Sequence, residues 1–201
     1  MKLLLLLLAL PMAGFGQNVN IPDANFKKYL VGNTAINTNG DKEIQVSEAS
    51  VFNDTIDCRS MNISNLKGIE AFTALTSLYC FENQLTSLDV SKNTALTYLN
   101  CSWNQLKSLD VSKNTALTYL GCWDNQLTSL DVSKNTALSD LYCYYNKLTS
   151  LDVSKNTALE YLSCDFNQLK SLDLSKNTAL WELSCDGNKF DCAALISKYG
   201  L

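Results

Sequence analysis

The side chains best suited to chemistry in this sequence are its eight cysteines. Six of them recur every 21 residues from Cys80 to Cys185, and Cys58 lies 22 residues before Cys80. Thiols that converge could form disulfides, bind a metal or carry out redox chemistry. A strict period instead indicates one equivalent position in a stack of repeats, so these seven cysteines should lie side by side along the stack.

The geometry of such a row favours free thiols. Parallel neighbours about 4.8 Å apart do not match the shorter Cβ separation and twisted arrangement of a disulfide. We therefore interpret the row as small buried hydrophobic side chains. Cys185 and Cys192 remain the candidate disulfide, and the sequence leaves that pairing open.

A second group of potential ligands lies between residues 37 and 48. Its spacing resembles an EF-hand-type calcium loop, with oxygen donors at loop positions 1, 3 and 5 and a glutamate at position 12. The candidate ligands are Asn37, Asn39, Asp41, Glu43 and Glu48. Asn37 replaces the usual aspartate, and Lys42 stands where glycine would make the turn, so the site is weak or lost. No cofactor is required, and a bound calcium ion would lock this segment.

Two carboxylates occupy a spacing that could support glycoside hydrolysis. Asp165 and Asp186 share one repeat position on adjacent repeats, about 5 Å apart at the backbone, which suits a retaining pair. An open repeat surface, however, provides no deep pocket to separate their pKa values. The chain has no histidine, which excludes histidine-based triads and histidine metal sites. We therefore predict no enzymatic activity, with a glycoside-active enzyme as the remote alternative, and expect these acids to attract a basic partner or a cation.

The repeat itself must position all of these side chains. Its apolar residues stand at positions 1, 4, 6, 11, 14, 16 and 21, with Asn at position 9. The repeats begin at Leu75, Leu96, Leu117, Leu138, Leu159 and Leu180. This framework resembles the leucine-rich repeat, with Cys in place of Leu at position 6. The resemblance implies an α/β solenoid with a parallel β-sheet on the concave face.

Other parts of the pattern complete the predicted architecture. In the return segment Leu-Asp-Val-Ser-Lys-Asn-Thr-Ala, the apolar residues Leu and Val lie two positions apart, which does not match the spacing of a helix face. We therefore expect an irregular convex side. The asparagines at position 9 should bind backbone groups in buried turns. A single repeat cannot fold alone, so stability must come from stacking.

We predict four segments along the chain. Residues 1–16 form a signal peptide, 17–52 a helical N-terminal cap that contains the calcium-like loop, 53–190 the solenoid, and 191–201 a C-terminal helical cap. The first repeat, 53–74, is divergent. Phe26 and Leu30 are spaced for one face of the N-terminal helix.

The N-terminal residues indicate where the protein is located, and the net charge restricts its partners. Met1-Lys2 precedes a short apolar run, and Gly14-Phe15-Gly16 suits cleavage before Gln17. That run is too short to span a bilayer, so we expect an exported protein without a membrane span. Without Lys2 the chain has 15 basic and 20 acidic residues, a net charge of −5, which argues against nucleic acid as a partner.

Function should lie where the repeats differ from one another. Positions 3, 5, 7 and 8 vary and project away from the core, and 11 of their 24 residues are aromatic. The predicted partner-binding residues are Tyr79, Phe81, Tyr98, Trp103, Tyr119, Trp123, Tyr142, Tyr144, Tyr145, Tyr161 and Phe166, with Asp165 and Asp186. Extended aromatic surfaces usually mark binding sites, although aromatic residues also favour strands and stack on one another.

The cap sequence Ile-Pro-Asp-Ala-Asn-Phe and the near-identical repeats add a resemblance. Together they resemble secreted leucine-rich repeat proteins of Bacteroidetes-type bacteria and, more distantly, the internalin family of bacterial surface adhesins. That resemblance implies contact with a protein or host surface and no enzymatic activity. We therefore predict a monomeric, secreted or cell-surface binding module for a protein or glycan. The alternative is a structural spacer or envelope protein without a specific ligand.

Overall fold

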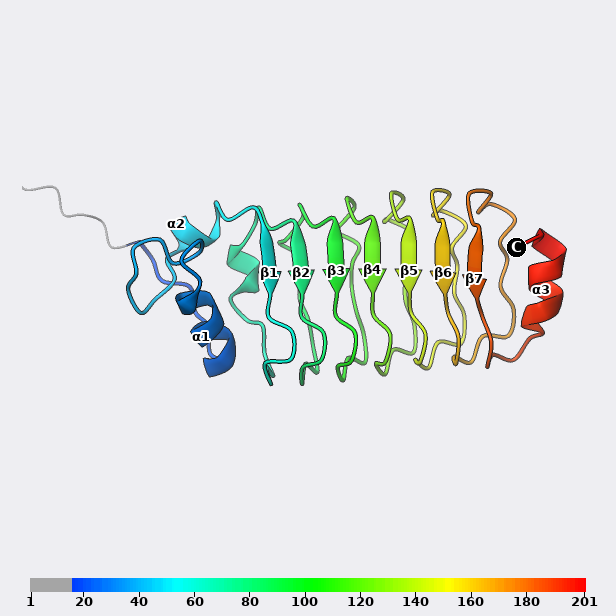
Figure 1. Ribbon diagram of the computed structural model, residues 1–201, viewed down its shortest axis with the longest axis horizontal. Coiled ribbons are helices and arrows are strands. Elements are labelled where there is room, and N and C mark those ends of the chain that lie inside the picture. Colours follow the sequence, from blue (N-terminus) through cyan, green and yellow to red (C-terminus); the bar gives the residue numbers. More distant parts are fainter. Residues whose placement is uncertain (1–15) are drawn as a thin grey trace, which may run out of the picture.

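The computed structural model describes residues 16–201, so the predicted signal peptide lies almost wholly outside the described residues. The chain forms a solenoid whose coils stack along one axis (Figure 1). Seven strands make one parallel sheet in chain order. Their bounds are β1 (Thr55–Asp57), β2 (Ser77–Tyr79), β3 (Tyr98–Asn100), β4 (Tyr119–Gly121), β5 (Asp140–Tyr142), β6 (Tyr161–Ser163) and β7 (Glu182–Ser184).

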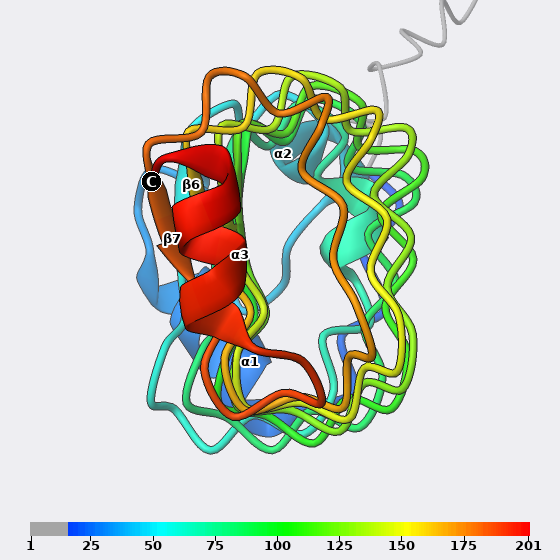
Figure 2. The same ribbon diagram turned by 90° about the vertical axis from the view of Figure 1, so that its right-hand side faces the viewer.

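Each coil has a sheet side and an irregular return side. Viewed along the solenoid, the strands line one wall and the return segments form the opposite wall (Figure 2). The return segments of the described chain contain one helical turn, the 3₁₀ helix η1 (Ile69–Ala71) in the first repeat. The predicted leucine-rich repeat solenoid with a short irregular convex side is therefore confirmed.

The strand register explains the core. Leu99 on β3 pairs with Leu78 on β2 and Leu120 on β4, so position 4 forms a continuous inward row. Because side chains alternate along a strand, position 6 also points inward. The six free cysteines of that row are buried: Cys58, Cys80, Cys101, Cys122, Cys143 and Cys164. The interpretation of the row as buried small side chains is confirmed.

Two rows of asparagine hold the turns between coils. At position 9, Asn125 donates through Nδ2 to the backbone oxygens of Cys101 and Cys122, and its Oδ1 accepts from the Leu106 amide. This is the predicted role of that row. A second row at position 19, which the sequence reading did not single out, acts similarly: Asn114 donates to the oxygens of Val90 and Asn93. Each coil is thus fastened to the one before it.

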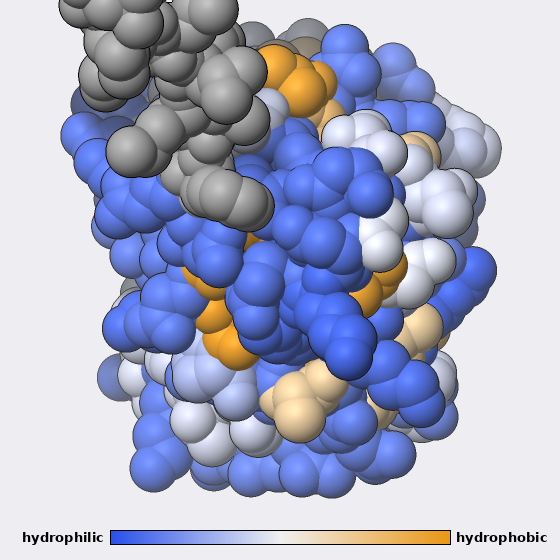
Figure 3. Space-filling view, turned by 90° about the vertical axis from the view of Figure 1, so that its left-hand side faces the viewer, coloured by the Kyte–Doolittle hydropathy of each residue, from blue (hydrophilic) through white to orange (hydrophobic). Residues whose placement is uncertain are grey.

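Helices lie at both ends of the solenoid: α1 (Ala24–Gly32), α2 (Val46–Ala49) and α3 (Cys192–Tyr199). The α1 helix begins after Pro22-Asp23, because the Asp23 carboxylate accepts bonds from the Asn25 and Phe26 amides. Phe26 and Leu30 are fully buried, so α1 covers the first coil. The end surface seen in Figure 3 is mostly hydrophilic outside the grey residues.

The C-terminal end is fastened covalently. A disulfide joins Cys185 at the end of the last coil to Cys192 at the start of α3. Asp191 accepts the Ala194 amide at the start of α3, and Gly200 follows the helix with a φ of 72°. The pairing that the sequence left open is therefore present, beside six free thiols.

Candidate protein-binding face

The predicted binding residues lie along one side of the molecule, the sheet face, which we define as repeat positions 2 to 8. Positions 3 and 5 point outward because position 4 points into the core. Positions 7 and 8 form the turn after each strand. The aromatic residues are Tyr98, Tyr119 and Tyr161 at position 3; Tyr79 and Tyr142 at position 5; Phe81, Trp123 and Tyr144 at position 7; and Trp103, Tyr145 and Phe166 at position 8.

Eight of these rings form a continuous row of contacts, termed the aromatic band. Its members, in order of contact, are Tyr79, Tyr98, Tyr119, Tyr142, Trp123, Tyr144, Tyr145 and Phe166. The closest ring centroids are those of Tyr98 and Tyr119, 4.1 Å apart with the rings 6° from parallel. Burial in the band raises the pKa of both phenols. Such contacts contribute about 0.5–1.5 kcal/mol per pair, so the band stabilises the sheet as well as forming a surface.

The position 8 residues are the accessible part of this surface. The exposed fractions of Trp103, Tyr145 and Phe166 are 54%, 50% and 49%. Their φ angles are 50°, 51° and 49°, in the left-handed region. That conformation costs about 1–2 kcal/mol for most L-residues, and Gly and Asn adopt it readily. Position 8 is left-handed in the other repeats too, at Ser60, Glu82, Asp124 and Gly187.

The position 9 asparagine fixes this unusual turn. Asn104 Nδ2 donates to the backbone oxygens of Cys101 and Ser102, at 3.1 Å and 3.0 Å. These bonds close the chain around Trp103, which lies between Ser102 and Asn104. The side chain at position 8 is therefore presented at the same place in each repeat, whatever its identity.

Two glycines make room for rings of the band. A Cβ atom on Gly121 would lie 2.6 Å from the Trp123 ring, and one on Gly187 would lie 2.6 Å from the Phe166 ring. Trp123 therefore folds back over its own strand, where it stacks on Tyr144 with ring centroids 5.4 Å apart. The glycines at these two places are required by the close approach of the rings.

Asp165 and Asp186 lie together at the turn after β6 and β7. Asp165 accepts bonds from the Ser163 and Ser184 hydroxyls at 2.8 Å and 2.7 Å. It also accepts from the Asp186 backbone amide at 3.0 Å. The Asp186 side chain is exposed. Asp165 is thus held in place by neighbouring donors at the surface of the sheet.

The sheet face is strongly acidic, with nine of the 20 Asp and Glu residues of the chain. Its carboxylates are Asp54, Asp57, Glu82, Asp124, Asp140, Glu160, Asp165, Glu182 and Asp186. Arg59 is the single basic residue at these positions. Among residues 16–201 two ion pairs form, Arg59 with Asp57 and Lys27 with Glu43. Eight sheet-face carboxylates therefore have no ion-pair partner in the described chain.

One aromatic residue of this face was missed by the sequence reading. Trp181 is 57% exposed and contacts Tyr161, with ring centroids 4.4 Å apart at an angle of 65°. It stands at position 2, which holds Thr or Ser in the four preceding repeats that begin at Leu75 to Leu138. The change of residue type at position 2 was the signal that could have revealed it.

The predicted calcium ligands lie close together in sequence: Asn37, Asn39, Asp41 and Glu43 are in the loop between α1 and α2, and Glu48 is on α2. Glu48 accepts four hydrogen bonds, two of them from Thr38. Burial opposes its ionisation, but these bonds outweigh burial and lower its pKa. Glu43 turns to Lys27, with an Oε1–Nζ distance of 2.7 Å. Within residues 16–201 no three His, Cys, Asp or Glu side chains are grouped closely enough to hold a metal, and calcium binding here stays a proposal.

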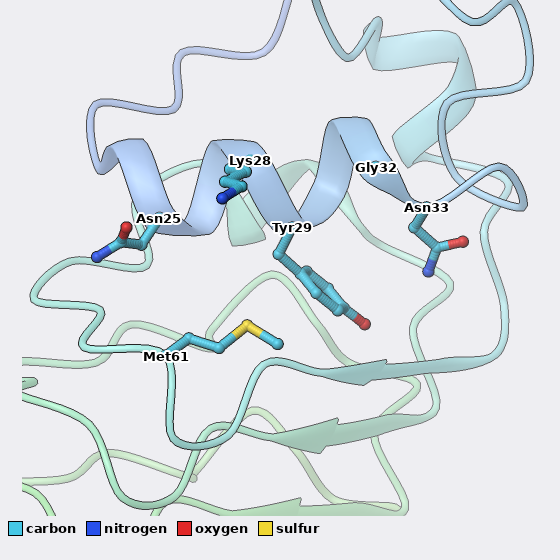
Figure 4. Close-up of a pocket in the computed structure, with 6 residues that line it drawn as sticks. All are labelled: Asn25, Lys28, Tyr29, Gly32, Asn33 and Met61. Carbon is cyan, nitrogen blue, oxygen red and sulfur yellow. The ribbon is translucent and has the colours of Figure 1, made fainter.

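A hollow of about 610 Å³ lies between α1 and the first coil (Figure 4). It is lined by Asn25, Lys28, Tyr29, Gly32, Asn33 and Met61. Tyr29 Oη accepts the Asp57 amide at 2.9 Å, so one wall is fixed to the edge of β1. This junction joins the N-terminal segment to the solenoid.

None of the helices among residues 16–201 has the length and apolar character needed to cross a membrane. No protein-family model matches the chain, and no curated protein does.

Solved structures show the fold. Internalin C2 from Listeria monocytogenes superimposes with a TM-score of 0.77 at 20% identity, covering 91% of this chain and 84% of that one. A leucine-rich repeat protein from Leptospira interrogans gives a TM-score of 0.60 at 24% identity, over 67% of this chain and 36% of that one. The functional domain of InlJ from L. monocytogenes, whose description includes a cysteine ladder, is 29% identical, with a TM-score of 0.39 over 90% of this chain and 55% of that one. The chain thus spans about half of that domain and about a third of the Leptospira protein, and its leucine-rich repeat fold is shown.

Proposed function

We propose that this protein is a non-enzymatic binding module that recognises a protein partner through its sheet face. Extended surfaces of stacked repeats commonly serve as binding sites. Here the surface combines rigid aromatic rings, which bury large area at low entropic cost, with unpaired carboxylates. The charge favours a partner with a basic surface, because complementary potentials speed association and suppress wrong partners.

One observation carries the proposal: three half-exposed aromatic residues occupy left-handed positions. The backbone there favours Gly or Asn, and half-exposed rings return little burial energy. Stacking between Tyr145 and Phe166 recovers part of this cost, but packing alone does not account for Trp103, which lies outside the aromatic band. A partner that covers these rings does.

The test exploits this backbone preference. Changing Trp103, Tyr145 and Phe166 together to Asn removes the rings and keeps a residue that tolerates the turn. Wild type and variant would be incubated with a protein array and a glycan array. We expect one or more protein ligands to bind wild type and to be lost in the variant, while the melting temperature stays within a few degrees. Equal binding by both proteins would refute the proposal. Binding to glycans alone would show that the partner is a glycan and not a protein.

A structural spacer is the competing function, and the stacked band is the observation that favours it. For a spacer, the variant would lose stability and neither array would yield a ligand. A matched control is Asp110→Asn on the return side, which should change neither stability nor binding.

We also propose export of the mature chain to the cell surface or the medium, and that it acts as a monomer. The predicted cleavage before Gln17 supports export. Amino-terminal sequencing of the protein released by its native host should begin at Gln17. Retention of residues 1–16 in the mature protein would contradict this proposal.

A further inference from the structure

We propose that Tyr161 and Trp181 form a binding corner for a cationic side chain, lysine or arginine, presented by a basic segment of a protein partner. The corner lies at the C-terminal end of the sheet face, outside the aromatic band. It deepens the proposed function by naming what one part of the face recognises.

The first element of the corner is the pair of rings. Tyr161 and Trp181 lie 4.4 Å apart at their centroids with an angle of 65° between the rings, so their planes form an open angle instead of a stack. The exposed fraction of Trp181 is 57%, which is higher than that of Trp103, Tyr145 or Phe166. Faces of Trp and Tyr attract a cation within about 6 Å through the ring quadrupole, and Trp does so best.

The second element is a set of carboxylates arranged around the rings by the strand register. Tyr161 on β6 pairs directly with Asp140 on β5 and Glu182 on β7. Glu160 precedes Tyr161 and occupies the same repeat position as Trp181, whose amide donates to the Glu160 backbone oxygen at 3.1 Å. Acidic and aromatic side chains therefore alternate both along and across the strands.

The negative charges in this region are not neutralised by an ion pair within residues 16–201. Desolvation raises the pKa of Tyr161, and the nearby carboxylates of Glu182, Asp140 and Glu160 raise it further. Neither ion pair of residues 16–201 includes any of the three carboxylates. The single sheet-face cation, Arg59, lies in the first repeat and is paired with Asp57.

This combination selects the occupant. Carboxylates alone would suit binding of a metal ion, and aromatic rings alone would suit binding of an apolar group. A lysine or arginine side chain uses both, because its charge meets the acids and its ammonium or guanidinium group lies on a ring face. Arginine should bind more tightly than lysine, since its planar group also stacks on Trp.

The probe is a short blocked peptide, acetyl-Gly-Gly-Arg-Gly-Gly-amide, titrated at low salt into the full mature chain. Its controls are the same peptide with lysine and with citrulline, which keeps the shape of arginine without its charge. The Trp181 indole N–H signal, assigned with Trp181→Phe, reports binding by nuclear magnetic resonance. We expect a saturable shift with arginine, a weaker one with lysine and at least fivefold weaker binding with citrulline.

Single substitutions at exposed positions test the corner without disturbing the fold. Trp181→Thr restores the residue found at position 2 of three repeats and should weaken arginine binding about fivefold, as expected for the loss of a cation–π contact. Glu182→Gln should weaken it about twofold to fivefold, in the range of an exposed ion pair. Asp54→Asn, at position 2 of the first repeat, is the matched control and should have no effect.

Equal binding of the arginine and citrulline peptides would overturn the inference, as would a saturable shift with calcium chloride and none with the peptides. If the peptides fail while the variant of Trp103, Tyr145 and Phe166 still loses its partner, the corner is wrong and the binding module stands. If the peptides bind and no protein ligand is found, the corner stands and the proposed function fails.

Discussion

Raising the pH past the ordinary pKa of a thiol should destabilise this protein steeply, because six free cysteines lie in its core. Burial raises the pKa of each of them, to about 12 for Cys58, Cys101 and Cys164. In the unfolded chain a thiol ionises near pH 8.5. Unfolding at alkaline pH therefore releases protons, so the stability is complete below about pH 8.5 and is lost as the pH rises toward the folded pKa.

The size of the effect follows from the number of thiols. At pH 9 each unfolded thiol has released about 0.8 proton, which costs about 0.8 kcal/mol relative to pH 7. Six of them together cost about 5 kcal/mol, and at pH 10 about 12 kcal/mol. The total stability of a domain is about 5–15 kcal/mol, so the fold should fail between about pH 9 and 10.

Urea unfolding under reducing agent at pH 7, 8, 9 and 9.5 measures this loss. The double variant Cys101→Ala, Cys122→Ala is the control, since it removes two of the six groups and should reduce the loss at pH 9 by about a third. An unfolding midpoint that is equal at pH 7 and pH 9 would refute the assignment of these cysteines as buried, protonated thiols.

Four further outcomes test other parts of the structure. Alkylation of the denatured protein should modify six thiols without reductant and eight after reduction, and fewer than six would contradict the free row. At the left-handed Trp103, the Asn variant should be about 1 kcal/mol more stable than the Ala variant, whereas at Tyr98 on β3 Asn should be no better than Ala; urea unfolding of the four variants decides. Asn125→Ala should cost about 3 kcal/mol because it leaves buried carbonyls without donors, and Asn188→Ala at the less covered end should cost less in the same assay; equal costs would be unexpected. Millimolar calcium should raise the melting temperature of the wild type and not that of Glu48→Gln, and a chelator alone should change neither. If calcium does not raise the melting temperature of the wild type, the loop does not bind calcium.

The fold was predictable because one period determines almost everything about it. Twenty-one residues per coil place each position beside its equivalent, and the alternation along a strand then fixes which rows point inward. That reasoning gives the Leu99 row, the cysteine row and the asparagine row at position 9. It also places the aromatic residues on the sheet face, because the register determines which positions point outward.

The parts that were not predictable depend on backbone angles and on single departures from the repeat. The aromatic residues at position 8 do not predict a left-handed turn, because Trp, Tyr and Phe do not favour that conformation. Only the closing bonds from the next asparagine, such as those of Asn104, reveal the conformation. Trp181 was missed because position 2 is nearly constant until the last two repeats. The position 19 asparagines lie in the return segment, for which the sequence predicted only an irregular convex side.

The left-handed aromatic residues are the strongest support for the proposed binding surface. Every repeat imposes the same turn at position 8, so each copy could hold Gly or Asn at lower cost. Gly187 in the last repeat shows that glycine is compatible with the turn. Trp103, Tyr145 and Phe166 instead keep half-exposed rings at strained positions. Selection for stability alone would favour Gly or Asn at these positions, so the rings support the proposed partner that buries them. If the triple Asn variant proved both as stable as wild type and equal in ligand binding, this explanation would fail.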